Sequence, residues 1–260
     1  MPSSEILVQP LSRRLGLLLL RRGSLLALLL ILAVFAVSAP NFLSPGNIAN
    51  VFAQSAILGI LAFGLTCVVI GGGSNVVSGG LDLSLAANLG LCAAVYSSLN
   101  NAGLNAAQAI GLTLLCGLAV GALNGFTVVV LRLPPLLATL ASMNLIAGLE
   151  LVLTQNSVLP TDSALLDILA TGEWLRVPVL AWVLLGVALL LGLLIQHSPY
   201  GLRLYAVGEY PQAARAAGLG VGRYVFSSYL IAGLCAAVAA FCSAAFFSGS
   251  TTRSEERRVG

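Results

Sequence analysis

Seven long apolar runs, separated by short polar turns, restrict the folds open to this chain. A membrane-spanning helix needs about 20 consecutive apolar residues, and each run has most or all of that length. The runs cover residues 24–39, 51–70, 85–99, 107–131, 136–154, 178–196 and 224–247. Because every backbone polar group in a bilayer must find a partner inside the protein, we expect an all-α, polytopic transmembrane helix bundle.

The charge content supports a membrane protein and excludes several functions. Only 8% of the residues are charged, against roughly 25% in soluble domains. All twelve basic residues are arginine, so the chain lacks the lysine of a phosphate-binding P-loop and the lysine of Schiff-base chemistry. The arginines flank apolar runs instead of forming one patch, so we expect the lipid bilayer and not nucleic acid as a partner.

Side chains that usually hold metals are few and scattered. His197 is the only histidine, and no cysteines form a CxxC pair. The cysteines all lie inside apolar runs, where a free cysteine behaves as a small hydrophobic residue. They are Cys67, Cys92, Cys116, Cys235 and Cys242. We expect no disulfide, no metal site and no cofactor on this chain.

Residues 71–84, GGGSNVVSGGLDLS, separate the second apolar run from the third. Each glycine costs a helix about 1 kcal/mol against alanine, so the five glycines here predict a broken backbone. Broken backbone at membrane depth must be buried or line a wet cavity, and in transporters it indicates a substrate path. Asp82 and Ser84 then stand where short polar side chains cap the next helix. A tight loop near the membrane surface is the alternative, and the sequence favours neither.

Small residues repeat along the fourth run. Gly117, Gly121 and Gly125 recur every four residues, which places them on one helix face and predicts close packing against a neighbour. Asn124 lies beside this face. We favour plain helix packing over a functional role for these glycines.

The arginines also predict which loops face the cytoplasm. Residues 1–23, the turn at Arg132 and the loop 197–223 are basic, whereas the turn 100–105 is uncharged and the loop 155–177 is net acidic. With seven spans, the basic and non-basic segments fall on opposite sides of the membrane. We therefore expect residues 1–23 to be a cytoplasmic N-terminal tail.

Residues 253–260, RSEERRVG, differ sharply from the apolar chain before them. The octapeptide resembles the translation of a common sequencing adapter. We expect a non-native tail here and a native sequence that departs from this one after Thr252; an ordinary charged tail is the alternative.

Four blocks follow one another in an order known from one transporter family. They are residues 41–54 (like FLT-x-x-N-x-x-N), 78–84 (SGGLDLS, like GGIDLSVG), 121–140 (like NG…P…ATL) and 200–218 (YGLRLYAVGEYPQAARAAG, like G-R-x-x-Y-A-x-G-x-N-x-x-A-A-x-x-x-G). Together they resemble the membrane permease subunits of ATP-binding-cassette (ABC) importers for ribose, xylose, arabinose and related sugars. The resemblance covers about residues 42–247.

The resemblance implies a transport subunit without catalytic residues in the bacterial inner membrane. Residues 24–252 would form an incomplete permease domain, with seven of about ten spans present. The expected partners are an ATPase subunit that binds ATP, a periplasmic sugar-binding protein and a second permease subunit, identical or not.

The resemblance further implies that the loop 197–223 holds a coupling helix that docks on the ATPase. Residues 210–218, with helix-forming alanines after Pro211 and a stop at Gly218, predict a short helix there. The candidate coupling residues are Gly201, Arg203, Tyr205, Ala206, Gly208, Ala213, Ala214, Arg215 and Gly218.

A sugar needs polar contacts along its path, because its hydroxyl groups lose water there. The candidates for that path are Gly79, Gly80, Asp82, Ser84, Asn88, Asn124, Thr139 and Asn144.

Other functions remain open at this stage. Related permeases carry branched-chain amino acids, nucleosides or a furanosyl signalling molecule. An ion-coupled secondary transporter would need paired intramembrane acids, and only Asp82 and Glu150 are available. An intramembrane enzyme would need metal ligands or an activated nucleophile, for which one histidine offers little.

Overall fold

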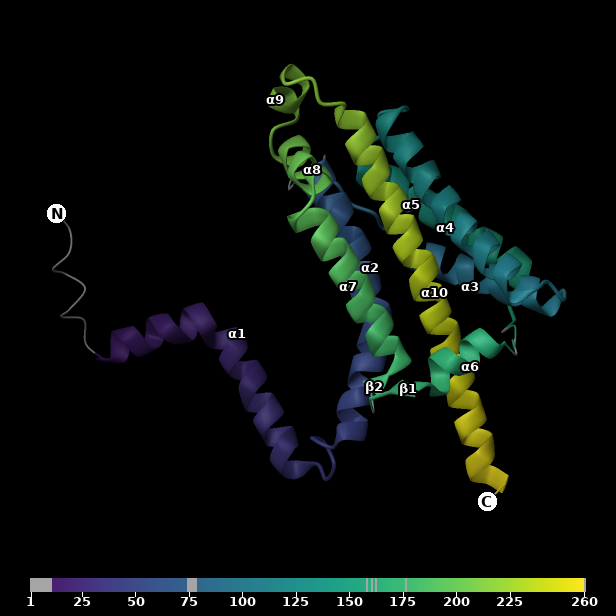
Figure 1. Cartoon of the computed structure of the whole chain (residues 1–260). Coiled ribbons are helices and arrows are strands. Elements are labelled where there is room, and N and C mark those ends of the chain that lie inside the picture. The colour runs from purple at the N-terminus through teal and green to yellow at the C-terminus, as the bar shows by residue number, and fades with distance from the viewer. Residues whose placement is uncertain are drawn as a thin grey trace. The chain divides into compact units, whose positions relative to one another are not determined.

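The computed structural model describes residues 11–73, 79–157, 159, 161, 163–175 and 177–259, with the backbone alone for residues 11–22 and 248–259 (Figure 1). Clustering of contacts separates residues 1–48 from residues 49–260. The first unit contains α1 (Leu11–Ser38), after which Phe42 stacks on Phe35 with the ring centroids 5.7 Å apart.

The second unit is almost entirely helical. Its elements are α2 (Pro45–Gly72, which begins in the first unit), α3 (Leu85–Asn101), α4 (Ala106–Val129), α5 (Pro135–Thr154), α6 (Ala164–Thr171), β1 (Glu173–Trp174), β2 (Val177–Pro178), α7 (Val179–Gln196), α8 (Pro199–Glu209), α9 (Pro211–Ala216) and α10 (Val221–Val259). The two short strands form an antiparallel pair with Glu173 opposite Pro178.

Among the described residues, five helices are long and apolar enough to cross a membrane. They are α2, α4, α5, α7 and residues Val221–Phe247 of α10. The prediction of an all-α, polytopic bundle is confirmed. Each predicted apolar run lies in a helix apart from one or two residues at some ends. Helix α3 has only 17 residues and reaches about 25 Å, which is less than the roughly 30 Å of a bilayer core. The apolar part of α1, Gly23–Ser38, is also shorter than a full span.

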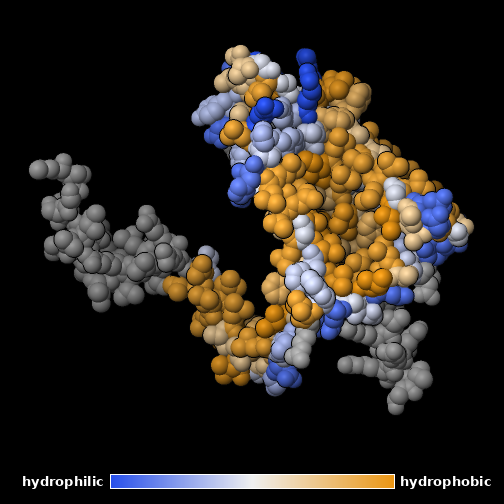
Figure 2. Space-filling model, in the orientation of Figure 1, coloured by the Kyte–Doolittle hydropathy of each residue, from blue (hydrophilic) through white to orange (hydrophobic). Residues whose placement is uncertain are grey.

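Helix α10 is the centre of the second unit and contacts α3, α4, α6, α8 and α9. Its buried side chains are mostly small, including Ala232, Ala236 and Ala240. The predicted glycine face of α4 packs here: a β-carbon at Gly117 would lie 2.6 Å from the carbonyl oxygen of Gly233, and one at Gly121 would overlap the carbonyl oxygen of Tyr229. The prediction of close helix packing is therefore confirmed. Figure 2 shows hydrophobic side chains over the middle of this unit and hydrophilic ones gathered toward its ends.

The loop predicted at 155–177 contains more structure than expected. Helix α6 buries Leu166 and Leu169 and packs against α10. The β1–β2 hairpin follows, and the ring of Trp174 lies 4.8 Å from that of Trp182. The sequence ALLDILA carries apolar residues at helical spacing. The segment is short and its neighbours are polar, so it did not stand out as a long apolar run.

The basic loop 197–223 is also more helical than predicted. Helix α9 confirms the helix expected after Pro211, and Gly218 has the left-handed φ of +80° that ends it. Helix α8 was not predicted. Its signal is Ser198, whose Oγ accepts a hydrogen bond from the Gly201 amide (3.3 Å), followed by proline at the first helical position.

Some predictions fall outside the described residues. Residues 1–10 of the N-terminal tail and residues 74–78 of the glycine-rich stretch are among them. In the tail at 253–260 the backbone is helical as far as Val259, and no side chain is described. Its native or non-native origin stays a prediction.

Candidate functional site: a buried polar network at the start of α3

The backbone breaks where the glycine-rich stretch predicts. We call residues 71–84 the glycine-broken segment, of which 71–73 and 79–84 are described. Helix α2 ends at Gly72, and Gly73 adopts a φ of +82° that side chains disfavour. A β-carbon at Gly80 would overlap the carbonyl oxygen of Val68, so residues 79 and 80 lie against the last turns of α2.

Just after this contact, Asp82 is the first member of a buried network of polar side chains. Its Oδ1 accepts hydrogen bonds from the amide of Ser84 (2.9 Å) and from the Ser84 hydroxyl (2.7 Å). The Asn124 amide group donates to Ser84 Oγ at 2.6 Å and to Asp82 Oδ1 at 3.3 Å. Asp82 is only 5% exposed, so these bonds replace the water that a carboxylate would otherwise bind.

Two side chains of α5 complete the network. Ser142 Oγ donates to Asn124 Oδ1 at 2.6 Å, and Thr139 Oγ1 accepts from the amide of Leu83 at 3.2 Å. We call Asp82, Ser84, Asn124, Thr139 and Ser142 the Asp82 network. It joins the start of α3 to α4 and α5, and every buried side-chain nitrogen and oxygen among the described residues has a partner.

The prediction that Ser84 caps α3 with its side chain is wrong. Ser84 stands at the N-cap position without a side-chain capping bond, and its φ of −82° and ψ of −9° are helical. The Ser84 hydroxyl group instead donates a hydrogen bond to Asp82 Oδ1. The Asp82 carboxylate takes the expected position at the helix start, where it accepts a hydrogen bond from the amide of Ser84.

The structure brings together only part of the predicted substrate path. Gly79, Gly80, Asp82, Ser84, Asn124 and Thr139 lie in or next to the network. Asn88 is buried one turn further along α3, where its Oδ1 accepts from the Cys92 thiol at 3.3 Å. Asn144 is exposed, and its amide donates to the Leu140 carbonyl on its own helix at 2.8 Å.

Two residues of this region were not among the predicted path residues. Ser142 was visible in the sequence, since it follows Thr139 by three residues and shares its helix face. The hydroxyl of Tyr229 on α10 donates to the Leu81 carbonyl at 3.2 Å. No local pattern marks Tyr229, because its partner is 148 residues away in the chain.

The network holds no cluster of metal ligands. Within the described residues, no three histidine, cysteine, aspartate or glutamate side chains gather. Glu150 lies away from Asp82, with its carboxylate over Gly90 of α3.

The predicted coupling residues occupy one end of the bundle, on α8, on α9 and, for Gly218, just after α9. Six of them are exposed: Arg203, Tyr205, Ala206, Ala213, Arg215 and Gly218. Gly201 and Ala214 are buried, and Gly208 is half-buried. Arg203 Nη1 donates to the Tyr224 hydroxyl at 3.4 Å, and Tyr200 shares a 2.8 Å hydrogen bond with Ser227, which fastens α8 to α10. Burial raises the pKa of the Tyr200 phenol, so this group stays protonated.

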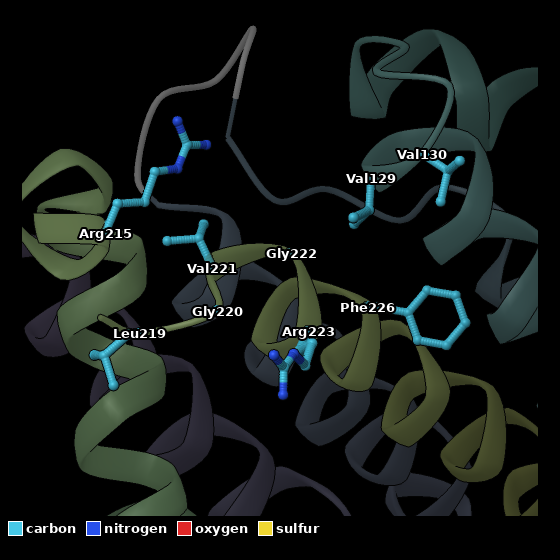
Figure 3. A pocket seen from close by; sticks show the side chains of 9 residues that line it. All are labelled: Val129, Val130, Arg215, Leu219, Gly220, Val221, Gly222, Arg223 and Phe226. Carbon is cyan, nitrogen blue, oxygen red and sulfur yellow. The ribbon is translucent and has the colours of Figure 1, made fainter. Parts of the chain in front are cut away.

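A groove of about 590 Å³ lies between α9 and the ends of α4 and α10. In Figure 3, Arg215 and Leu219 stand on one side of it and Val129, Val130 and Phe226 on the other. Arg223 also lines the groove, and within the described chain neither arginine forms an ion pair. The groove thus combines apolar side chains with two arginines that have no acidic partner among the described residues.

Comparison with known proteins supplies the class of this molecule. A family model described as "Branched-chain amino acid transport system / permease component" matches residues 47–256. The chain belongs to this permease family. The match covers α2 to α10 and therefore contains the Asp82 network, α8 and α9.

Individual relatives agree with the family. The permease is 30% identical over 236 residues to the ribose import permease protein RbsC of Escherichia coli (strain K12), which is 89% of this chain and 71% of that relative. It is 32% identical to RbsC of Bacillus subtilis (strain 168), over 84% of this chain and 66% of the relative. It is 29% identical to the autoinducer 2 import system permease protein LsrC of Photorhabdus luminescens, over 83% and 63%. No solved structure matches the chain.

Proposed function

We propose that this permease is the membrane subunit of an ABC importer that carries a small sugar of the pentose or hexose class across the inner membrane. The observation that supports this most is the similarity to ribose import permeases over more than four-fifths of the chain. ATP hydrolysis belongs to a separate ATPase subunit, and a periplasmic binding protein delivers the sugar. A second permease subunit, identical or not, completes the membrane part, and the N-terminus lies in the cytoplasm.

In this proposal α9 and the groove beside it form the docking surface for the ATPase. Helix α9 is exposed apart from Ala214, so it can insert into a partner without unfolding. A partner segment with apolar side chains and a carboxylate would complement the Val129–Val130 wall and Arg215. Residues 197–223 are then the coupling loop of a permease domain that spans residues 24–252.

The Asp82 network and the glycine-broken segment are proposed to border the sugar path. Hydroxyl and amide groups of this kind can exchange hydrogen bonds with sugar hydroxyls, and unwound backbone at membrane depth is a recurring position for transporter substrates. Asn88 and Asn144 are proposed as further polar contacts on the path.

Two alternatives remain as solutes of the same kind of importer: a branched-chain amino acid, as in the family description, and a furanosyl signal such as autoinducer 2. An ion-coupled transporter is supported less, because in the described structure Asp82 is surrounded by neutral polar groups and not by a second acid. Uptake assays with labelled ribose, leucine and autoinducer 2 separate these solutes.

Charge reversal at Arg215 tests the proposal. We expect Arg215→Glu to reduce co-purification of the ATPase by about tenfold, because a misplaced charge in an interface is strongly unfavourable. The permease should still insert in the membrane, since Arg215 is exposed. Glu173→Arg is the control, a charge reversal at an exposed residue of β1 at the opposite end of the second unit (Figure 1). Unchanged co-purification in Arg215→Glu would contradict the docking assignment.

A further inference from the structure

Helix α8 differs from α9 in that it is packed into the bundle. Gly201, Leu204 and Val207 form its buried face, and Leu204 is fully enclosed. A β-carbon at Gly71 would lie 2.9 Å from Leu204 Cδ1, which shows how closely α8 covers the last turn of α2. Helix α9 faces outward, so the two short helices have different surroundings.

The first direct backbone contact joins α8 to the end of α2. A β-carbon at Gly208 would overlap the carbonyl oxygen of Ile70 and lie 3.3 Å from the amide nitrogen of Gly73. In the reverse direction, a β-carbon at Gly73 would lie 2.6 Å from the carbonyl oxygen of Gly208. No flexible side chain separates the two backbones, so a shift of α8 must displace residues 70–73 or open a gap.

A second backbone contact continues from α2 to the far side of the glycine-broken segment. A β-carbon at Gly72 would overlap the α-carbon and amide nitrogen of Gly80. Beyond Gly80, Leu81 is held by Tyr229 and Leu83 by Thr139. Residues 79–81 therefore connect the contact with α2 directly to Asp82, the first member of the Asp82 network.

We propose that α8 transmits movement of the docking surface to the Asp82 network through these two glycine contacts. The first contact is Gly208 with Ile70 and Gly73, and the second is Gly72 with Gly80. This inference rests on the proposed function, because α9 must bind a subunit that moves. These contacts act by packing alone. The residues that position α8 against α2 are therefore the glycines and Leu204, and the arginines of the docking surface are not needed for this step.

Amide hydrogen exchange on the assembled permease and ATPase tests the relay, with the nucleotide-free and vanadate-trapped states compared. In the wild type, trapping is expected to change exchange in peptides covering residues 79–87 by about tenfold. Gly72→Ala should abolish this change while the ATPase still co-purifies and traps nucleotide, because the added methyl group separates Gly72 from Gly80. Leu204→Ala, which removes a contact without adding bulk, should do the same and serves where Gly72→Ala does not accumulate.

Gly192→Ala on α7 is the matched control, since a β-carbon there meets nothing within 4 Å; it should respond to trapping as the wild type does. A trapping response that survives in both Gly72→Ala and Leu204→Ala overturns the relay. So does a wild type that binds the ATPase but shows no response at residues 79–87. A wild type that binds no ATPase overturns the proposed function, and the relay with it.

Discussion

Asn124 is the residue at which the polar contacts of three helices meet. Its amide nitrogen donates to Ser84 and Asp82, and its amide oxygen accepts from Ser142. Asn124 is fully buried, so no water can replace a lost bond. The same side chain therefore links α3, α4 and α5.

Replacing this amide is expected to destabilise the permease strongly. Asn124→Leu removes one hydrogen bond from each of three buried groups, on Ser84, Asp82 and Ser142, and we expect a loss of about 2–4 kcal/mol in the free energy of unfolding. Asn144→Leu, at an exposed amide, should change it by less than about 0.5 kcal/mol. Thermal unfolding in detergent measures both, and equal shifts in Tm would contradict the network.

At the scale of residues, the sequence predicted which residues form the site better than it predicted where their side chains point. Asp82, Ser84, Asn124 and Thr139 were all named, and all four meet. Asn144 does not join them, because it follows Thr139 by five residues and so points about 140° away on a helix with 100° per residue. Ser142 follows Thr139 by three residues and points toward Asn124.

At the scale of elements, the α4–α10 interface depends on the absence of side chains. Gly117, Gly121 and Gly125 on α4 all face α10 or its side chains. In a membrane the hydrophobic effect does not drive helices together, because lipid tails are as apolar as the side chains. Close packing of the backbones at small residues therefore contributes much of the helix association.

A larger side chain in this interface should force the two helices apart. Gly121→Leu would collide with the backbone of Tyr229, and we expect a loss of about 3 kcal/mol or more in stability. Gly111→Leu on the same helix is the control, since nothing lies within 4 Å of that position. Gel filtration and thermal unfolding of the two variants check the prediction; similar behaviour would show that α4 does not pack on α10 in this way.

The long helices could be predicted from apolar length, whereas of the short ones only α9 was predicted, from Pro211 at its start and Gly218 after its end. Helix α8 has 11 residues and α6 has 8, below the length at which periodicity is distinct from chance. Helix α6 exists because Leu166 and Leu169 find a place against α10. That contact joins segments far apart in the chain, so no local sequence pattern could predict it.

At the scale of the whole molecule, charge divides the two ends of the second unit. Arg132, Arg203, Arg215 and Arg223 belong to the end that carries α8 and α9, whereas Asp167 and Glu173 lie on α6 and β1 at the other. From the positive-inside rule we propose that the first end lies in the cytoplasm.

Cysteine labelling of intact cells tests this orientation. Ala102→Cys and Gln212→Cys are both at exposed positions, and we expect a membrane-impermeant maleimide to label only Ala102→Cys until the cells are permeabilised. Background from the native thiols should be low, because Cys67, Cys92, Cys235 and Cys242 are buried and the half-buried Cys116 lies inside the apolar helix α4. Labelling of Gln212→Cys from outside would reverse the orientation.

The central position of α10 has a consequence for biosynthesis. The ribosome makes α3, α4 and α6 before the helix on which all three pack, so for a time the glycine face of α4 lacks its main neighbour in the bilayer. Tyr229, 148 residues further along the chain than Leu81, likewise reaches its partner only late in synthesis. We therefore expect nascent chains that have not yet passed Phe247 to be the form most dependent on insertases and most readily degraded by membrane proteases.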